Sequence, residues 1–120
     1  HESQSLTIDY TCEKLEMNDE LAHSIRGNKD QTMIYLPKSI ENYRFRHPQI
    51  GDRISPLGMR GSSLVSNILK DAKLTTKQRR DYWLLEEIST GEIIWLPGLK
   101  RSRHSLVDFS ASEVYKVVYN

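Results

Sequence analysis

The alternation of apolar and polar positions predicts a chain built mainly from β-strands. Residues 5–11 place an apolar side chain at every second position, which is the period of a half-buried strand. Short strands are also predicted at 33–36, where Pro37 ends the run, and at 43–46. The apolar residues of 113–119 predict a last strand at the end of the chain.

A β-hairpin is predicted between 83–88 and 92–96, because two β-rich runs flank a Ser-Thr-Gly turn. The continuous apolar run 93–96 indicates that the second arm is central in a sheet and covered on both faces. Trp83 and Trp95 lie inside these runs. We therefore interpret both as core residues rather than as platforms for base stacking.

Two short helices are predicted in the middle of the chain. Ser62 or Ser63 can cap the first, which presents one apolar stripe at helical spacing. The stripe consists of Leu64, Val65, Ile68 and Leu69. Thr75 or Thr76 can cap a second, basic helix that ends near Asp81. Together these elements predict an α+β fold, a mostly antiparallel sheet or β-sandwich with two short helices.

The composition is typical of a single globular domain, since 38% of the 120 residues are hydrophobic and 28% are charged. The lone Cys12 cannot form an internal disulfide, which favours a reducing compartment, and we expect the cytoplasm. No run approaches the roughly 18 apolar residues that a membrane span requires, so no membrane contact is expected. The chain does not begin with Met, and we expect a fragment of a longer protein.

Charge is unevenly distributed although the formal net charge is only +1. Residues 1–41 carry eight acidic and four basic side chains, whereas residues 42–80 carry nine basic and two acidic ones. A second basic cluster, residues 100–104, follows the turn at 97–98. The two basic segments can form one anion-binding patch only if the fold brings them together.

Neighbouring charged residues in two predicted strands lead to two further expectations. Arg44 and Arg46 share one strand face, and we expect both guanidinium groups to face solvent, where they suit an anion. Glu86 and Glu87 are adjacent in a strand, so their carboxylates point to opposite faces and cannot share a proton.

Motifs for catalysis are missing from the sequence. It has no phosphate-binding loop, no dinucleotide fingerprint, no zinc-protease helix and no serine nucleophile elbow. The four histidines have no neighbours at metal-ligand spacing. We therefore identify no catalytic residue and no metal ligand, and we expect no cofactor in this chain.

Residues 51–61, GDRISPLGMRG, form the most specific motif. They resemble the GDR-x-x-PLGM-[KR]-G signature of the C-terminal domain of bacterial tRNA(Ile)-lysidine synthetase. Downstream, Asp71-x-Lys73 and Arg79 match the D-x-K and the arginine of that family, and residues 93–98, IIWLPG, resemble its IVW-x-x-G run. The resemblance covers about residues 30–120 and leaves residues 1–29 as an N-terminal lead-in strand and connector.

Four positions depart from the family pattern. Ser62 and Ser63 stand where the family commonly has one or two lysines, Asn67 replaces an aspartate, and Lys100 replaces an arginine. The ATP-pyrophosphatase motif SGGxDS, which carries adenylation in the catalytic domain of the family, does not occur in these residues. This chain is therefore expected to make no lysidine by itself.

The resemblance implies a fold like that of a phenylalanyl-tRNA synthetase β-chain domain and a role in holding tRNA(Ile), largely at its acceptor stem. It also implies that the full enzyme is an ATP-dependent carbon–nitrogen ligase, which joins lysine to the wobble cytidine and whose N-terminal catalytic domain is a partner of this one. Exposed arginines and lysines would then contact phosphates. The candidates are Arg53, Arg60, Lys73, Arg79, Lys100, Arg101 and Arg103.

Structural alternatives stay open for several candidates. Arg53 can pair with the adjacent Asp52, and Arg79 can brace the hairpin. Arg101 and Arg103 follow a turn and are expected to be more exposed. The competing function is a non-catalytic docking or dimerisation domain, in which the tryptophan-bearing hairpin packs on another domain or on a second copy. The spatial distribution of charge discriminates the two.

Overall fold

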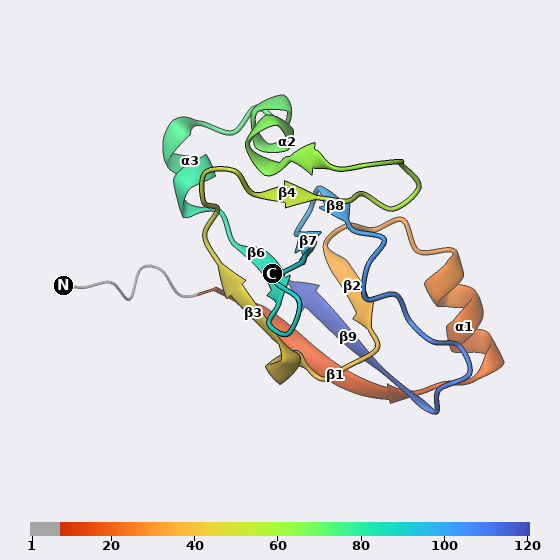
Figure 1. The fold of residues 1–120 in the computed structure, drawn as a ribbon. Helices are drawn as coiled ribbons and strands as arrows, with labels where there is room; N and C mark the ends of the chain where they lie inside the picture. The colour runs from red at the N-terminus through yellow and green to blue at the C-terminus, as the bar shows by residue number, and fades with distance from the viewer. Residues whose placement is uncertain (1–7) are drawn as a thin grey trace.

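Two sheets and three α-helices make up the fold of residues 8–120, which are the residues that the computed structural model describes (Figure 1). In chain order the elements are β1 (Tyr10–Glu16), α1 (Asp19–Arg26), β2 (Met33–Leu36), the 3-10 turn η2 (Ile40–Asn42), β3 (Tyr43–Arg46), β4 (Arg53–Ile54), β5 (Ser63–Leu64), α2 (Val65–Asp71), α3 (Thr76–Asp81), β6 (Leu84–Glu87), β7 (Ile93–Leu96), β8 (Lys100–Arg101) and β9 (Glu113–Tyr119).

The sheets are mostly antiparallel, as predicted. One sheet has the strand order β1-β9-β2. The other has the order β3-β6-β7-β4-β5, with β8 paired to β7, and its β4–β7 pairing is parallel. The α+β prediction is therefore confirmed, and the sheet that contains β4, β7 and β8 carries the residues of the sequence signature.

Strand β7 connects the two parts of the core. All four of its residues are buried, which confirms the expectation of a central strand. Ile94 and Trp95 pack into a cluster with β2 and β9, whereas Ile93 and Leu96 pack into a second cluster with α2. The Trp95 indole Nε1 donates a hydrogen bond to the carbonyl oxygen of Gln31 at 2.9 Å, so Trp95 is a satisfied core residue.

The N-terminal region differs from the sequence prediction. The strand expected at 5–11 is β1, which starts at Tyr10 and pairs with β9 along its whole length. Residues 5–7 of that prediction lie outside the described residues. The expected connector contains helix α1, capped by Asn18, whose side chain accepts the Leu21 N–H at 2.7 Å. The division of the chain at residues 29 and 30 stays a prediction.

The caps of the two predicted helices give different outcomes. Thr75 caps α3 in a reciprocal capping box with Gln78, as expected. The serine cap of α2 is wrong: Leu64 stands at the N-cap, without a side-chain hydrogen bond, and Ser62 instead accepts from Arg53. None of the helices between residues 8 and 120 is long and apolar enough to cross a bilayer.

Candidate nucleic-acid interface

The signature loop, residues 51–61, depends on backbone conformations that glycine adopts without strain. Gly58 has φ +83° and Gly61 has φ +69°, and nothing lies within 4 Å of a Cβ built at either position. The requirement for glycine therefore comes from the backbone and not from lack of space. Asp52 holds the start of the loop, because its carboxylate accepts the Gln49 N–H at 2.7 Å and the Arg46 guanidinium at 2.9 and 3.1 Å.

The fold brings the second basic cluster against this loop. Pro56 and Ser102 form an antiparallel bridge. The Leu57 N–H donates to the Arg101 carbonyl at 3.0 Å, and the Arg103 N–H donates to the Ser55 carbonyl at 2.9 Å. Two basic segments that are far apart in sequence are thus hydrogen-bonded neighbours in space.

Arg103 and Arg60 extend from this junction. The Arg103 Nη1 donates to the Met59 carbonyl at 3.0 Å and to the Gly61 carbonyl at 2.9 Å, which fixes the end of the loop. Arg103 is nevertheless exposed, as expected. Arg60 is also exposed and lies on the loop between these two carbonyl groups. Both side chains are placed where an anion in solution can reach them.

Arg101 does not have the expected exposure. Its guanidinium donates to four backbone carbonyls, those of Ser102 (2.8 Å), Tyr35 (3.1 Å), His104 (2.8 Å) and Ser105 (2.9 Å). Burial lowers the pKa of Arg101 from its ordinary range to about 10, because desolvation penalises the charged form. A strand pattern read from sequence misses this, since the acceptors come from a loop and from β2.

Arg53 and Arg79 are both braced by neighbouring residues, although not in the expected way. Arg53 Nε donates to the Ser62 hydroxyl at 2.7 Å and its Nη2 to the Ser62 carbonyl at 3.0 Å, so Ser62 takes the place predicted for Asp52. Arg79 Nη1 donates to the Leu74 carbonyl at 2.8 Å and thereby braces the turn between α2 and α3, not the hairpin. Arg53 remains exposed, whereas Arg79 is half-buried.

Lys73 and Lys100 are the remaining candidates. Lys73 is exposed just after α2 and has φ +67°. Lys100 is half-buried in β8. Three further basic side chains are exposed on α2 and α3 although they were not singled out as candidates: Lys70, Lys77 and Arg80. Their position in the basic segment 42–80 is the sequence signal that could have identified them.

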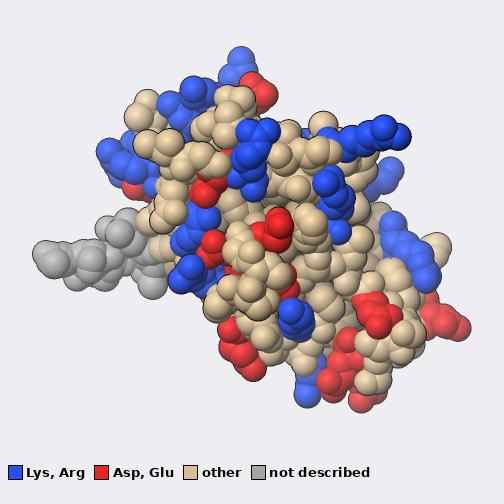
Figure 2. All heavy atoms as spheres, in the orientation of Figure 1, with Lys and Arg blue, Asp and Glu red and all other residues tan. Residues whose placement is uncertain are grey.

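The two signs of charge are unevenly distributed over the molecular surface, although Asp81 of α3 pairs with Lys77 and Arg80 among the basic side chains. Figure 2 shows Lys and Arg side chains over the upper part of the molecule, where Figure 1 places α2, α3, β4 and β8. Asp and Glu side chains gather at the lower edge, near β1 and α1. The near-neutral chain therefore presents a basic face, defined here as the signature loop, residues 100–103, α2 and α3.

The two arginines of β3 do not belong to this face. Arg44 faces solvent as expected, with its side chain 61% exposed, whereas the expectation is wrong for Arg46, whose side chain is 17% exposed. Arg44 lies directly opposite Glu86 in the β3–β6 register, and its Nε is 2.8 Å from the Glu86 carboxylate. Arg46 is paired with Asp52 and also lies 3.3 Å from Glu86. Asp52 and Glu86 raise the pKa of Arg46, the Asp52 hydrogen bond contributing most. These arginines stabilise the sheet internally.

Glu86 and Glu87 have separate partners, in agreement with opposite faces. Glu87 binds the Lys38 ammonium at 2.9 Å and accepts the Thr90 hydroxyl at 2.8 Å. The Lys38 hydrogen bond lowers the pKa of Glu87 below its ordinary value.

Trp83 is half-buried, with its ring centroid 4.0 Å from that of His47. Across residues 8–120, no group of three or more His, Cys, Asp or Glu side chains is arranged to hold a metal ion.

Comparison with known sequences identifies tRNA(Ile)-lysidine synthases as relatives. The chain is 49% identical over 57 residues to the enzyme of Bacillus subtilis (strain 168), which corresponds to 48% of this chain and 12% of the relative. It is 29% identical over 103 residues to that of Bacillus cereus, covering 83% of this chain and 21% of the relative. The chain thus spans about a fifth or less of the length of these relatives. No protein-family model matches it.

Solved structures confirm the fold. The crystal structure of a TilS C-terminal domain superposes with a TM-score of 0.75 at 21% identity, over 92% of this chain and 82% of the other. An N-terminal fragment of the phenylalanyl-tRNA synthetase β-subunit from Pyrococcus horikoshii gives a TM-score of 0.61 at 15% identity, over 91% and 38%. Both are the fold types that the signature motif implied.

Proposed function

We propose, starting from the likeness of this chain in sequence and fold to the C-terminal domain of tRNA(Ile)-lysidine synthases, that it binds tRNA(Ile) through the basic face. The contact is to the acceptor stem and runs mainly through phosphates. In the complete enzyme this domain holds the tRNA while the N-terminal catalytic domain uses ATP to join lysine to the wobble cytidine. The complete enzyme works in the cytoplasm.

The observation that carries the proposal is the hydrogen-bonded junction between the signature loop and residues 101–103. Binding to a helical stem requires cations from separate segments on one surface, and here Arg103 donates to the carbonyls of Met59 and Gly61, the residues on either side of Arg60. Side chains cannot read the deep, narrow major groove of A-form RNA, so such a surface works chiefly through phosphates and 2′-hydroxyl groups.

The docking alternative rests on a different observation. Leu57 and Met59 are 52% and 53% exposed at the tip of the signature loop, although both are large apolar residues. The second arm of the hairpin gives the alternative no support, because Trp95 and the rest of β7 are buried within this chain. A docking function would use the loop tip, or Ile88 at the end of the first arm, which is 52% exposed.

The test measures binding of a labelled acceptor-stem RNA to the chain across a salt series. Arg60→Ala should weaken binding to stems of different sequence by similar factors, because phosphates carry no base identity. It should also reduce the slope of log affinity against log salt by about 0.7 to 0.9. Lys14→Ala is the matched control, because Lys14 is an exposed lysine on β1, outside the basic face.

Equal effects of Arg60→Ala and Lys14→Ala would show that binding follows net charge alone and would refute the proposed face. Loss of self-association or of binding to another domain after Leu57→Ser and Met59→Ser, without any RNA binding by the unmodified chain, would establish the docking function.

A further inference from the structure

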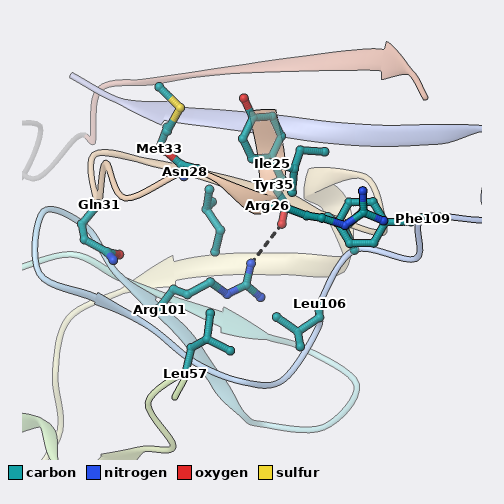
Figure 3. Close-up of a pocket in the computed structure, with 12 residues that line it drawn as sticks. Ile25, Arg26, Asn28, Gln31, Met33, Tyr35, Leu57, Arg101, Leu106 and Phe109 are labelled. Atoms are coloured by element: carbon teal, nitrogen blue, oxygen red, sulfur yellow. Dashed lines mark hydrogen bonds between the residues drawn. The ribbon is translucent and has the colours of Figure 1, made fainter. Parts of the chain in front are cut away.

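An apolar pocket of about 350 Å³ lies beside the basic face, between α1, β2, the tip of the signature loop and the loop that follows β8. Its wall includes Met33, Leu57, Leu106 and Phe109 (Figure 3). The volume is near the lower end of the range of roughly 300–1,000 Å³ for ligand pockets, so it suits one compact group. Leu57 and Arg101 belong both to the pocket and to the junction described above, so the two surfaces are continuous.

The polar lining of the pocket is cationic. Arg26 lies over the Phe109 ring, with the guanidinium carbon 4.1 Å from the ring centroid. Arg101 also lines the pocket, and four of its five N–H groups donate to backbone carbonyls. The fifth, on Nη1, has no acceptor within residues 8–120, and no carboxylate of that part of the chain forms an ion pair with Arg101.

Among residues 8–120, no Asp or Glu side chain lines the pocket. Asp30 and Asp108, which are close in sequence to lining residues, accept hydrogen bonds from the Thr32 and Ser110 hydroxyls, each at 2.6 Å. The pocket therefore combines an apolar wall, an aromatic ring and two guanidinium groups without a counter-charge in its lining. That combination is complementary to a flat apolar group attached to an anion.

We propose that the pocket accepts one unstacked nucleotide of the bound RNA, with the base against the apolar wall and the phosphate facing Arg26 and Arg101. This inference rests on the proposed RNA-binding function. A nucleotide is favoured over a peptide carboxylate because the pocket pairs its cations with an aromatic wall and the chain's basic face continues from it. A base in a stacked stem cannot enter, so the ligand is a nucleotide from the single-stranded 3′ end.

The experiment compares a blunt acceptor-stem RNA with the same stem carrying a short single-stranded 3′ extension. Leu106→Trp fills the mouth of the pocket, and Ile88→Trp is its control, since Leu106 and Ile88 are 47% and 52% exposed and Ile88 does not line the pocket. The unmodified chain and Ile88→Trp should bind the extended RNA at least about fivefold more tightly than the blunt RNA. Leu106→Trp should bind both RNAs equally, with the unmodified chain's affinity for the blunt stem.

A second variant tests the contribution of the cationic lining of the pocket. Arg26→Gln changes an exposed side chain and should also reduce the preference for the extended RNA, whereas Lys29→Gln, its neighbouring control, should not. Adenosine monophosphate added alone should shift the NMR signals of Met33 and Phe109 in the unmodified chain and not in Leu106→Trp.

The outcomes separate the two proposals. If the chain binds the blunt stem and gains no affinity from the extension, the nucleotide pocket is overturned and the basic face is left intact. This holds even if adenosine monophosphate binds, because the pocket then takes a free nucleotide and not one of the bound RNA. Tighter binding of a peptide with a free C-terminal carboxylate than of the extended RNA overturns it as well. Failure to bind either RNA overturns the RNA-binding function, whereas signal shifts with adenosine monophosphate would still report on the pocket.

Discussion

The guanidinium of Arg103 donates a hydrogen bond of 2.9 Å to the carbonyl oxygen of Gly61, which lies 42 positions earlier in the chain. This bond links the end of the signature loop to the segment after β8. It uses only Nη1 of the guanidinium, which leaves Nε and Nη2 without a side-chain or backbone acceptor within residues 8–120. One side chain can therefore brace the loop and still offer donors to a phosphate.

Loop conformation sets the first prediction. Gly58→Ala should lower the free energy of unfolding by about 1 kcal/mol, because alanine is strained at φ +83°. Gly27→Ala is the control, since Gly27 has φ −90° and its added Cβ would make only ordinary contact. Urea unfolding measures both. Equal effects at the two positions would contradict the backbone explanation of the signature glycine.

The half-buried Arg101 gives a second prediction. Arg101→Ala should lower the free energy of unfolding by about 2 to 4 kcal/mol, because it leaves several carbonyl groups without a donor. Arg101→Lys should recover little, since an ammonium group cannot reproduce the planar fork. Arg60→Ala, at an exposed position on the same face, should change it by less than about 0.5 kcal/mol. A stable Arg101→Ala protein would show that these hydrogen bonds are weak.

The elements with strong periodicity could be predicted from the sequence. Strand β7 is continuously apolar and is central, and Thr75 with Gln78 forms the capping box that its spacing indicates. Helix α1 was missed, although its ends carry sequence signals: Asn18 at the N-cap, Asp19 and Glu20 in the first turn, and Gly27 at the end. Its apolar stripe is weak, because Ala22 is its one buried residue.

The candidate site could be predicted in location and only partly in residue roles. The signature motif identified the loop, and charge counting identified the second basic cluster. Neither indicates which arginine or lysine is hydrogen-bonded or ion-paired within the chain. Arg44 is paired because β3 and β6 happen to be in a register that places it opposite Glu86. Arg101 is only half-buried, but loop carbonyls converge on its guanidinium. Both outcomes depend on pairings that are distant in sequence.

The apolar stripe of α2 allows a third prediction. Leu69 is 1% exposed, whereas Ile68 is only partly buried against the same cluster. Leu69→Ala should therefore lower the free energy of unfolding by about 2 to 5 kcal/mol, through lost burial and a cavity, and Ile68→Ala should cost clearly less. The same pair of urea titrations would refute this orientation of the helix if Ile68→Ala proved the more damaging change.

Acid sensitivity gives a fourth prediction, centred on the Lys38–Glu87 pair. The pKa of Glu87 lies below its ordinary value of 4.5, chiefly because of the Lys38 hydrogen bond. A carboxyl group with a lowered pKa in the folded state stabilises the fold above its unfolded pKa, and this contribution is lost as the pH falls through the folded pKa. The free energy of unfolding should therefore decrease below about pH 4.5, and by less in Glu87→Gln.

The control for this effect is Glu113→Gln, which removes an exposed carboxylate 3.5 Å from the Lys14 ammonium. Chemical unfolding at neutral pH and at several acidic values measures all three proteins. If Glu87→Gln lost as much stability with acid as the unmodified chain, Glu87 would not be a source of the acid sensitivity.

The last prediction separates the two roles of Arg103. If Arg103 contacts phosphate, Arg103→Ala should reduce the slope of log affinity against log salt by about 0.7 to 0.9. Arg103→Lys should keep most of that slope because it keeps the charge, while it weakens affinity because a lysine cannot hold two carbonyls and a phosphate in one plane. Both variants should lose some stability of the signature loop, which hydrogen exchange at Met59 and Gly61 can follow. If Arg103 only braces the loop, hydrogen exchange again speeds up in both variants, but the slope of log affinity against log salt is the same for both and for the unmodified chain. The phosphate contact must then be made by other residues of the basic face.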